Sequence, residues 1–172
     1  MLINNAGIMQ PEDIATAPDY LGIAERTIAT NLLGPIRLTA ALLPHLRARP
    51  HAGILTVSSG LAFVPMAATP TYSATKAAIH SYSMAMRHQL RDTSIQVIEI
   101  VPPYVQTELL GAHLANDPAA MPLTDFITEV KQLLSGDAAS AEVVVGRCAP
   151  LRFAAENGRM DAMFQAVNGA AH

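Results

Sequence analysis

Short apolar runs alternate with long stretches of helical periodicity, and this alternation limits the chain to few architectures. The runs at 2–3, 54–57 and 95–101 read as buried strands, and the stretches 19–47 and 71–91 between them read as helices. Six apolar residues recur at helical spacing in the first stretch: Ile23, Ile28, Leu32, Ile36, Ala40 and Leu43. Because helix-length connections join neighbouring parallel strands, we predict an α/β fold with a parallel sheet.

The C-terminal part of the chain is predicted to be mostly helical. Helices are expected near 125–134, over 138–155 with Gly158 as a C-cap, and at 161–167, with a short helix near Leu109. The sequence has no internal repeat and no linker of altered composition. We therefore expect one domain over residues 1–172.

The composition narrows the class of protein. The chain is 51% hydrophobic and 15% charged with a net charge of −3, which predicts a globular domain and argues against nucleic-acid binding. Charged residues interrupt every apolar stretch, so no membrane span is expected, and the first residues do not resemble a signal peptide. One cysteine, Cys148, excludes an intrachain disulfide and fits a cytoplasmic location; it reads as a small core residue.

Unusual local sequences follow each of the three predicted strands. These are Asn-Asn-Ala-Gly at 4–7, Ser-Ser-Gly at 58–60 and Pro-Pro-Tyr-Val-Gln-Thr at 102–107. Ligands of open α/β sheets bind beyond the carboxyl ends of the strands. We therefore expect these three segments to meet at one edge and form a site.

Tyr72 and Lys76 lie four residues apart on the second predicted helix, so their side chains share one face. A free tyrosine has a pKa of about 10 and is a poor base near neutrality. A neighbouring ammonium favours the phenolate and is expected to lower that pKa. Such a pair can exchange a proton with an alcohol or carbonyl oxygen, although the spacing alone also fits an ordinary helix surface.

Two other kinds of chemistry are disfavoured. The six histidines lie in separate predicted elements without the tight spacing of zinc ligands, so no metal site is predicted; they are His45, His51, His80, His88, His113 and His172. Ser59 lacks the Gly-x-Ser-x-Gly context of a hydrolase nucleophile.

Several motifs occur together in a fixed order. They are Asn-Asn-Ala-Gly at 4–7, Asn31 in the first helix, Ser59 at a strand end, Tyr-Ser-Ala-Thr-Lys at 72–76 and Pro-x-x-Val-x-Thr at 102–107. In this combination the chain resembles the short-chain dehydrogenase/reductase family. The resemblance implies a Rossmann-like doubly wound parallel sheet and hydride transfer between NADP or NAD and a small alcohol or carbonyl substrate.

The resemblance also implies roles for four catalytic residues. Tyr72 would be the general acid/base, and Lys76 would lower its pKa and hold the nicotinamide ribose. Ser59 would hydrogen-bond the substrate oxygen, with Ser58 as the competing candidate. Asn31 would lie at a helix irregularity and hold a water that relays protons to Lys76; otherwise it is a buried Asn at a kink.

Further cofactor contacts are implied at the strand ends. The backbone of Asn5, Ala6 and Gly7 would face the adenosine side, with Asn5 closest. The turn at 102–107 would contribute Pro102, Val105 and Thr107, the last two near the nicotinamide carboxamide. The apolar segment 108–126 would form a substrate lid.

Family members usually have Pro-Gly where this chain has Pro102 and Pro103. Pro103 lacks an N–H, so the backbone contact with the cofactor must differ at this position. A Pro-Pro turn of this type resembles the turns of a DltE-like subgroup of bacterial oxidoreductases.

The family normally begins with a strand and a glycine-rich turn that cradles the pyrophosphate. No such pattern precedes Asn4, so we expect an incomplete fold that lacks the first βαβ half, truncated at the N-terminus. Exposed apolar surface, poor solubility and negligible cofactor binding should follow. The alternative to an enzyme is a non-catalytic remnant that dimerises through its two long helices, as family members commonly form homodimers or homotetramers.

Overall fold

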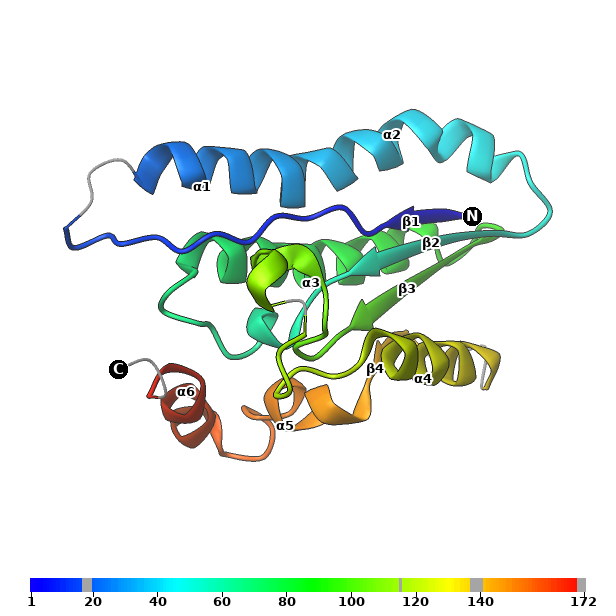
Figure 1. Ribbon diagram of the computed structural model, residues 1–172. Coiled ribbons are helices and arrows are strands. Elements are labelled where there is room, and N and C mark those ends of the chain that lie inside the picture. The colour runs from blue at the N-terminus through cyan, green and yellow to red at the C-terminus, as the bar shows by residue number, and fades with distance from the viewer. Residues whose placement is uncertain (17–19, 115, 137–140, 170–172) are drawn as a thin grey trace.

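Four parallel strands form the centre of the molecule. The computed structural model describes residues 1–16, 20–114, 116–136 and 141–169 (Figure 1). The strands β1 (Leu2–Asn4), β2 (Ala52–Val57), β3 (Ile95–Val101) and β4 (Glu142–Val144) lie in the order β1-β2-β3-β4, and each pair is parallel. The predicted parallel sheet is confirmed, and the carboxyl ends of all its strands point to one edge.

One face of the sheet is covered by the two long helical connections. The first consists of α1 (Tyr20–Ile28), a π-helical turn η1 (Ala29–Leu33) and α2 (Gly34–Arg47), and the second is α3 (Pro70–Leu90). The helices and strands enclose a core of seven buried residues: Leu2, Leu46, Ile54, Met86, Leu90, Ile95 and Val97. Proline stands at the start of α3, where its missing N–H leaves no helical hydrogen bond unmade.

The opposite face is covered by α4 (Leu123–Ser135). Successive strand residues point to opposite faces of a sheet, and Leu55, the neighbour of Ile54, belongs to a second core together with Ile100 and Val130 of α4. Helices therefore lie on both faces, as Figure 1 shows. This is the Rossmann-like, doubly covered parallel sheet that the family resemblance implies.

The prediction of a helix over 138–155 is wrong. Residues 138–140 lie outside the described part of the chain, and the described remainder contains β4, the 3-10 turn η5 (Gly146–Cys148) and the short α5 (Ala149–Arg152). Val143, Val144 and Val145 are β-branched and favour a strand. The segment therefore completes the sheet beside β3.

Short elements occupy the rest of the C-terminal part. The 3-10 turns are η2 (Gly60–Ala62), η3 (Glu108–Leu110) and η4 (Ala112–Leu114), and the last helix is α6 (Met160–Asn168). Gly158 has a positive φ of +64°, but the prediction that it caps a helix is wrong, because α5 ends at Arg152 with Phe153 as its C-cap. In the part of the chain that the structure describes, no helix combines the length and the apolarity that a membrane span needs.

Candidate active site

The predicted site segments meet at the carboxyl edge of the sheet. The Gly60 amide donates to the Pro102 carbonyl (3.1 Å), which joins the ends of β2 and β3. The Lys76 ammonium of α3 donates to the Val57 carbonyl (2.8 Å) at the end of β2. The segment after β1 joins through Ile8, which hydrogen-bonds Asn31.

Tyr72 and Lys76 lie on the buried face of α3, and each side chain is only 5% exposed. The Lys76 Nζ lies 5.5 Å from the centroid of the Tyr72 ring. An ammonium carries three donors, and Val57 accepts one of them among the described residues. The two remaining N–H groups match the hydroxyls of a bound sugar, which is the fit that a nicotinamide ribose requires.

Burial dominates the protonation of this pair. Desolvation raises the pKa of Tyr72 to about 12, and a hydrogen bond with the Ser59 side chain opposes that rise. Desolvation also lowers the pKa of Lys76 to about 8. The net pKa of Tyr72 is therefore raised in this structure, because removal of the phenolate from water is the largest effect on it.

The structure separates the two serine candidates. The Ser59 side chain accepts from the Leu61 amide (3.1 Å), which caps η2, and hydrogen-bonds Tyr72. Ser58 is 1% exposed, and its hydroxyl donates to the Ile100 carbonyl (3.3 Å). Of the two, Ser59 is the serine whose hydroxyl faces the Tyr72 phenol.

Asn31 lies in the π-helical turn η1 and is 1% exposed. Its Oδ1 accepts from the Ile8 amide (2.8 Å), and its Nδ2 donates to the Ile8 carbonyl (2.9 Å) and to Thr75 Oγ1 (3.3 Å). The side chain thus ties the segment after β1 to α3. The helix irregularity expected at Asn31 is present, and π turns of this kind are frequent at functional sites.

The Asn-Asn-Ala-Gly segment lines the same edge of the sheet. Asn5 and Ala6 are exposed, and Gly7 is half-buried. A Cβ atom at Gly7 would lie 3.5 Å from Asn31 Oδ1 and 3.7 Å from Lys76 Nζ. Gly7 therefore borders Lys76 directly.

The turn after β3 contributes more through its backbone than through its side chains. Val105 forms a parallel bridge with Met121, and the Thr107 hydroxyl accepts from the Leu109 amide (3.4 Å). Pro102 offers its carbonyl to Gly60, and Pro103 is half-buried. Val105 and Thr107 are half-buried at the base of the expected lid, of which residue 115 lies outside the described residues.

Sequence reasoning missed a charged cluster between α3, β3 and β4. His80 Nδ1 lies 2.8 Å from Glu99 Oε2, and Glu99 is fully buried. Glu142, the strand neighbour of Glu99, binds Arg152 through Nε (2.6 Å) and Nη2 (3.2 Å). The eight-residue spacing of His80 and His88 gave no signal for it, because its partners come from other strands. Potential ligand atoms of His80, Glu99 and Glu142 lie within 4.8 Å of one another, but Arg152 already neutralises part of their charge.

The sequence of this chain is similar to those of known oxidoreductases. The family model described as short chain dehydrogenase matches residues 1–117. The uncharacterized oxidoreductase DltE of Bacillus subtilis is 49% identical over 109 residues, which are 63% of this chain and 43% of that protein. The NADP-dependent 3-hydroxy acid dehydrogenase YdfG of Escherichia coli K12 is 34% identical over 121 residues, which are 68% of this chain and 47% of that protein.

Solved structures show the same fold. A short chain dehydrogenase from Burkholderia cenocepacia, solved in complex with NADP, aligns with a TM-score of 0.82 at 24% identity, over 96% of this chain and 69% of that one. The chain spans less than half the length of the two curated relatives named above. The family model covers more than half of the chain. The chain therefore belongs to the short chain dehydrogenase family.

Proposed function

We propose that this chain carries the catalytic residues of an oxidoreductase that transfers hydride between NADP or NAD and a small alcohol or carbonyl substrate. The observation that carries the proposal is the burial of three groups together at the end of β2: the Tyr72 phenol, the Ser59 hydroxyl and the Lys76 ammonium. A relative named as NADP-dependent and a fold neighbour solved with NADP support the choice of cofactor.

The proton chemistry follows from the pKa of Tyr72. With that pKa raised to about 12, the phenol keeps its proton at neutral pH and is ready to donate it to a carbonyl oxygen. Ser59 is placed to donate a hydrogen bond to the same oxygen, where negative charge develops. A bound nicotinamide would supply the hydride for carbonyl reduction.

The remaining site residues are proposed to hold the cofactor. Lys76 would bind the ribose hydroxyls with its two remaining donors, and Asn31 would keep the segment after β1 at the correct distance from α3. The other contacts are proposed for Asn5, Ala6 and Gly7 after β1 and for Pro102, Val105 and Thr107 after β3.

The pair Ser59 and Ser58 gives a matched test. Turnover of a panel of small ketones and aldehydes would be followed by NADPH consumption in the wild type, Ser59→Ala and Ser58→Ala. We expect Ser59→Ala to lower kcat by about 100-fold or more, as for loss of an oxyanion donor. Ser58→Ala should retain kcat, because its hydroxyl serves the Ile100 carbonyl. Equal activity of Ser59→Ala and the wild type would contradict the proposal.

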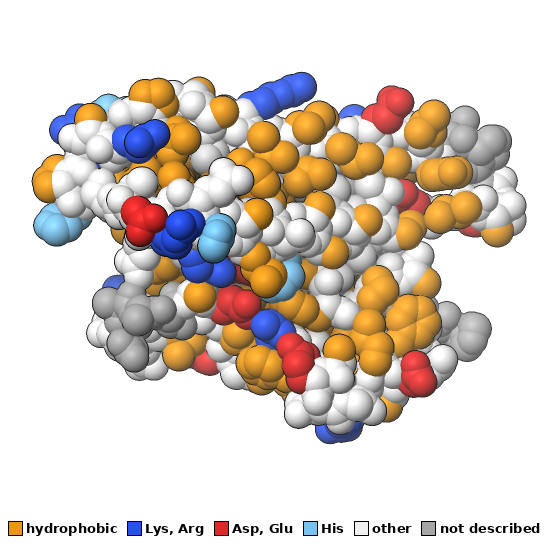
Figure 2. All heavy atoms as spheres, turned by 180° about the vertical axis from the view of Figure 1, so that it is seen from behind, with side chains coloured by type: hydrophobic (Ala, Val, Ile, Leu, Met, Phe, Trp, Pro, Cys, Tyr) orange, Lys and Arg blue, Asp and Glu red, His pale blue; other side chains and the backbone are white. Residues whose placement is uncertain are grey.

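A second candidate function rests on the outer surface of the long helices. Leu38 of α2 is 46% exposed and Met84 of α3 is 53% exposed, and Figure 2 shows apolar side chains spread widely over one face of the molecule. Such a surface suits self-association. A protein that only dimerises through it would need no proton donor at Tyr72.

A further inference from the structure

Phe63 lies between two polar side chains beside the proposed active site. It directly follows the turn η2, and its amide donates to the Gly60 carbonyl (3.1 Å), which closes that turn. The His80 ring meets the Phe63 ring edge to face, with 4.7 Å between the centroids and 68° between the planes. The Arg152 Cζ lies 4.5 Å from the centroid of the same ring. Phe63 is therefore held on two sides.

Carboxylates on two neighbouring strands fix both of these side chains. His80 Nδ1 lies 2.8 Å from Oε2 of Glu99 on β3. Arg152 donates to Glu142 of β4 through Nε (2.6 Å) and Nη2 (3.2 Å), which fixes the plane of its guanidinium. Glu99 and Glu142 are partners in the parallel pair of β3 and β4. The sheet thus sets the position of the Phe63 ring.

Glu99 contributes little to stability in this arrangement. It is fully buried, and its Oε1 has no hydrogen-bond partner among the described residues. A buried carboxylate with one unmet oxygen is costly, and well-packed apolar residues in its place are often as stable or more stable. A polar pair kept at such a cost beside a site is expected to serve the placement of other groups.

The turn that Phe63 ends is the turn that Ser59 begins. The Ser59 hydroxyl accepts from the Leu61 amide (3.1 Å), caps η2 and hydrogen-bonds Tyr72. The Gly60 amide ties the start of the turn to the Pro102 carbonyl (3.1 Å). With its other end fixed by Phe63, the turn cannot rotate about that single hydrogen bond, so the direction of the Ser59 hydroxyl is fixed.

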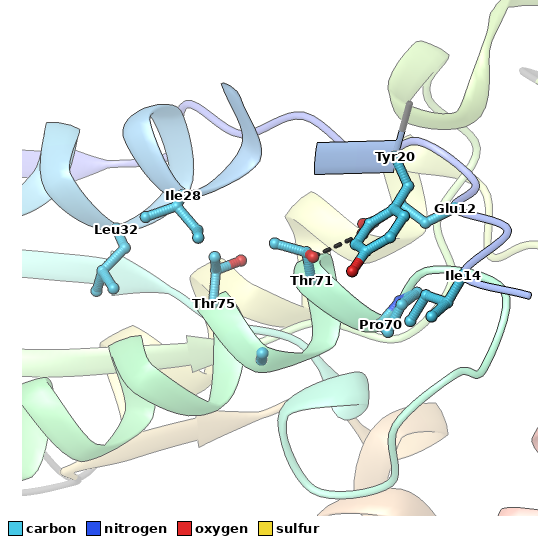
Figure 3. A pocket seen from close by; sticks show the side chains of 9 residues that line it. Glu12, Ile14, Tyr20, Ile28, Leu32, Pro70, Thr71 and Thr75 are labelled. Carbon is cyan, nitrogen blue, oxygen red and sulfur yellow. Dashed lines mark hydrogen bonds between the residues drawn. The ribbon is translucent and has the colours of Figure 1, made fainter. Parts of the chain in front are cut away.

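Tyr72 is held separately, by contacts of the first turns of α3. The Thr71 hydroxyl donates to Glu12 Oε2 (2.6 Å), which Figure 3 shows at one end of a hollow between α1 and α3. The Thr75 hydroxyl accepts from Asn31 Nδ2 (3.3 Å). Neither contact involves η2. The placement of the serine hydroxyl relative to the phenol therefore depends on the second restraint, at the end of η2.

We propose that Phe63 is a positioning residue that keeps the Ser59 hydroxyl directed at the carbonyl oxygen of the substrate. His80 and Glu99 share this role, because they set the orientation of the ring. The inference rests on the proposed function, since it assigns a part in the same reaction. Each ring contact of Phe63 is worth roughly a factor of two to ten in an equilibrium constant. Removal of the ring should therefore free the turn in about tenfold more molecules.

Phe63→Leu tests this role, because it removes the ring and keeps an apolar side chain. Hydrogen exchange at the Leu61 amide reports on Ser59 directly, since that amide donates to its hydroxyl. Relative to exchange in β3, we expect it to accelerate about tenfold, and kcat for ketone reduction to fall about tenfold. The KM for NADPH should stay the same, because the turn acts on the substrate oxygen. Phe63→Tyr keeps both ring contacts and should recover most of the lost kcat.

Phe153→Leu is the matched control. The Phe153 ring also contacts Arg152, with 5.0 Å from Cζ to its centroid, but it follows α5 instead of η2. Its replacement should change neither the exchange at Leu61 nor kcat. Phe63→Leu values that match those of Phe153→Leu would overturn the proposal and show the Phe63 ring to be ordinary packing.

A double variant tests the anchor of the ring and keeps the chain folded. His80→Leu combined with Glu99→Leu removes the buried carboxylate together with its partner, so the fold should be as stable as in the wild type. The Phe63 ring loses its edge contact, and exchange at Leu61 should accelerate at least about twofold. Unchanged exchange would overturn the role of the pair. If the wild type has no turnover, hydride transfer fails as the proposed function, whereas exchange at Leu61 still decides whether Phe63 holds Ser59.

Discussion

At the scale of single residues, the site is defined by what burial does to two titratable groups. Desolvation keeps the Tyr72 phenol protonated and lowers the pKa of the Lys76 ammonium to about 8. The charged form of Lys76 is thus held in a place that disfavours it. A group kept at such a cost is expected to serve binding or chemistry more than stability.

Replacement of Lys76 by Met should therefore stabilise the isolated chain at neutral pH. The shift of its pKa from 10.5 to about 8 corresponds to about 3 kcal/mol, and loss of the donor to Val57 offsets part of this, so a gain of about 1–2 kcal/mol is expected. Urea unfolding monitored by circular dichroism measures it.

The stability difference between Lys76→Met and the wild type is expected to change with pH. Between pH 8 and 10.5 the unfolded chain binds more protons at Lys76 than the folded chain, so the contribution of Lys76 to stability rises with pH. The advantage of Lys76→Met should therefore shrink across this range. An advantage that is constant with pH, or a variant less stable than the wild type at pH 7, would contradict the assignment of a buried ammonium.

Gly60 illustrates a residue fixed by close packing. A Cβ atom there would lie 2.8 Å from Leu151 Cδ1 and 2.9 Å from Cys148 Sγ. We expect Gly60→Ala to lower the free energy of unfolding by about 1–3 kcal/mol. Gly22→Ala is the control, because its Cβ would meet only Arg26 Nη1 at 3.5 Å, and alanine in a helix should stabilise by up to about 1 kcal/mol.

The individual site residues were predictable to different degrees. The order of the motifs along the sequence predicted three site residues, Tyr72, Lys76 and Ser59. The structure brings their side chains together. The carboxylates of Glu12 and Glu99 could not be found, since their burial depends on residues distant in sequence, such as Thr71 for Glu12. The raised pKa of Tyr72 could not be predicted, because spacing shows a neighbouring charge but not the extent of desolvation.

At the scale of secondary-structure elements, the π turn η1 links the segment after β1 to α3. Asn31 makes three hydrogen bonds from this turn, two to Ile8 and one to Thr75. We expect Asn31→Ala to cost about 2–4 kcal/mol, because it leaves the N–H and C=O groups of the half-buried Ile8 without their partner. Hydrogen exchange at the Ile8 amide should accelerate, whereas exchange in β3 should follow global unfolding alone.

Asn31→Asp is the informative comparison for this element. It keeps the acceptor for the Ile8 amide and removes both donors, so protection of that amide should be partly retained. Equal exchange rates at Ile8 in the wild type and Asn31→Ala would show that the turn does not hold this segment.

The elements themselves were predicted well where apolar periodicity was long. The strands β2 and β3 and the helix α3 were all found, because each is bounded by clear Gly, Pro or Ser signals. The interruption of the first helix was invisible to periodicity, and only the family resemblance pointed to it. The strand β4 was missed because it has three residues, and a run that short does not show whether its period is that of a strand or a helix.

At the scale of the whole molecule, the outer face of the long helices exposes large apolar side chains, among them Leu38 and Met84. If it mediates self-association, Met84→Glu should shift the chain toward the monomer, because a buried charge at an interface is costly. Sedimentation velocity across a concentration series measures the shift. Gln89→Glu introduces the same charge at an exposed position of α3, and an equal effect of both substitutions would point to general charge repulsion instead.

The sheet edge at β1 is the other whole-molecule feature. β1 pairs with β2 alone among the described strands, and Ile3 is 53% exposed. Exposed apolar surface at such an edge was expected from the sequence. The arrangement of α4 on the opposite face could not be predicted, because the pattern of an amphipathic helix does not reveal which face of the sheet it covers.

The most direct measurement of the central claim is the rate of carbonyl reduction by NADPH in the wild type and Tyr72→Phe. The substitution removes only the phenol oxygen, so the packing of the ring on α3 is kept. We expect kcat to fall by about 100- to 10,000-fold, as for loss of a general acid, with NADPH affinity changed less than threefold. Turnover that is the same in Tyr72→Phe and the wild type would contradict the account.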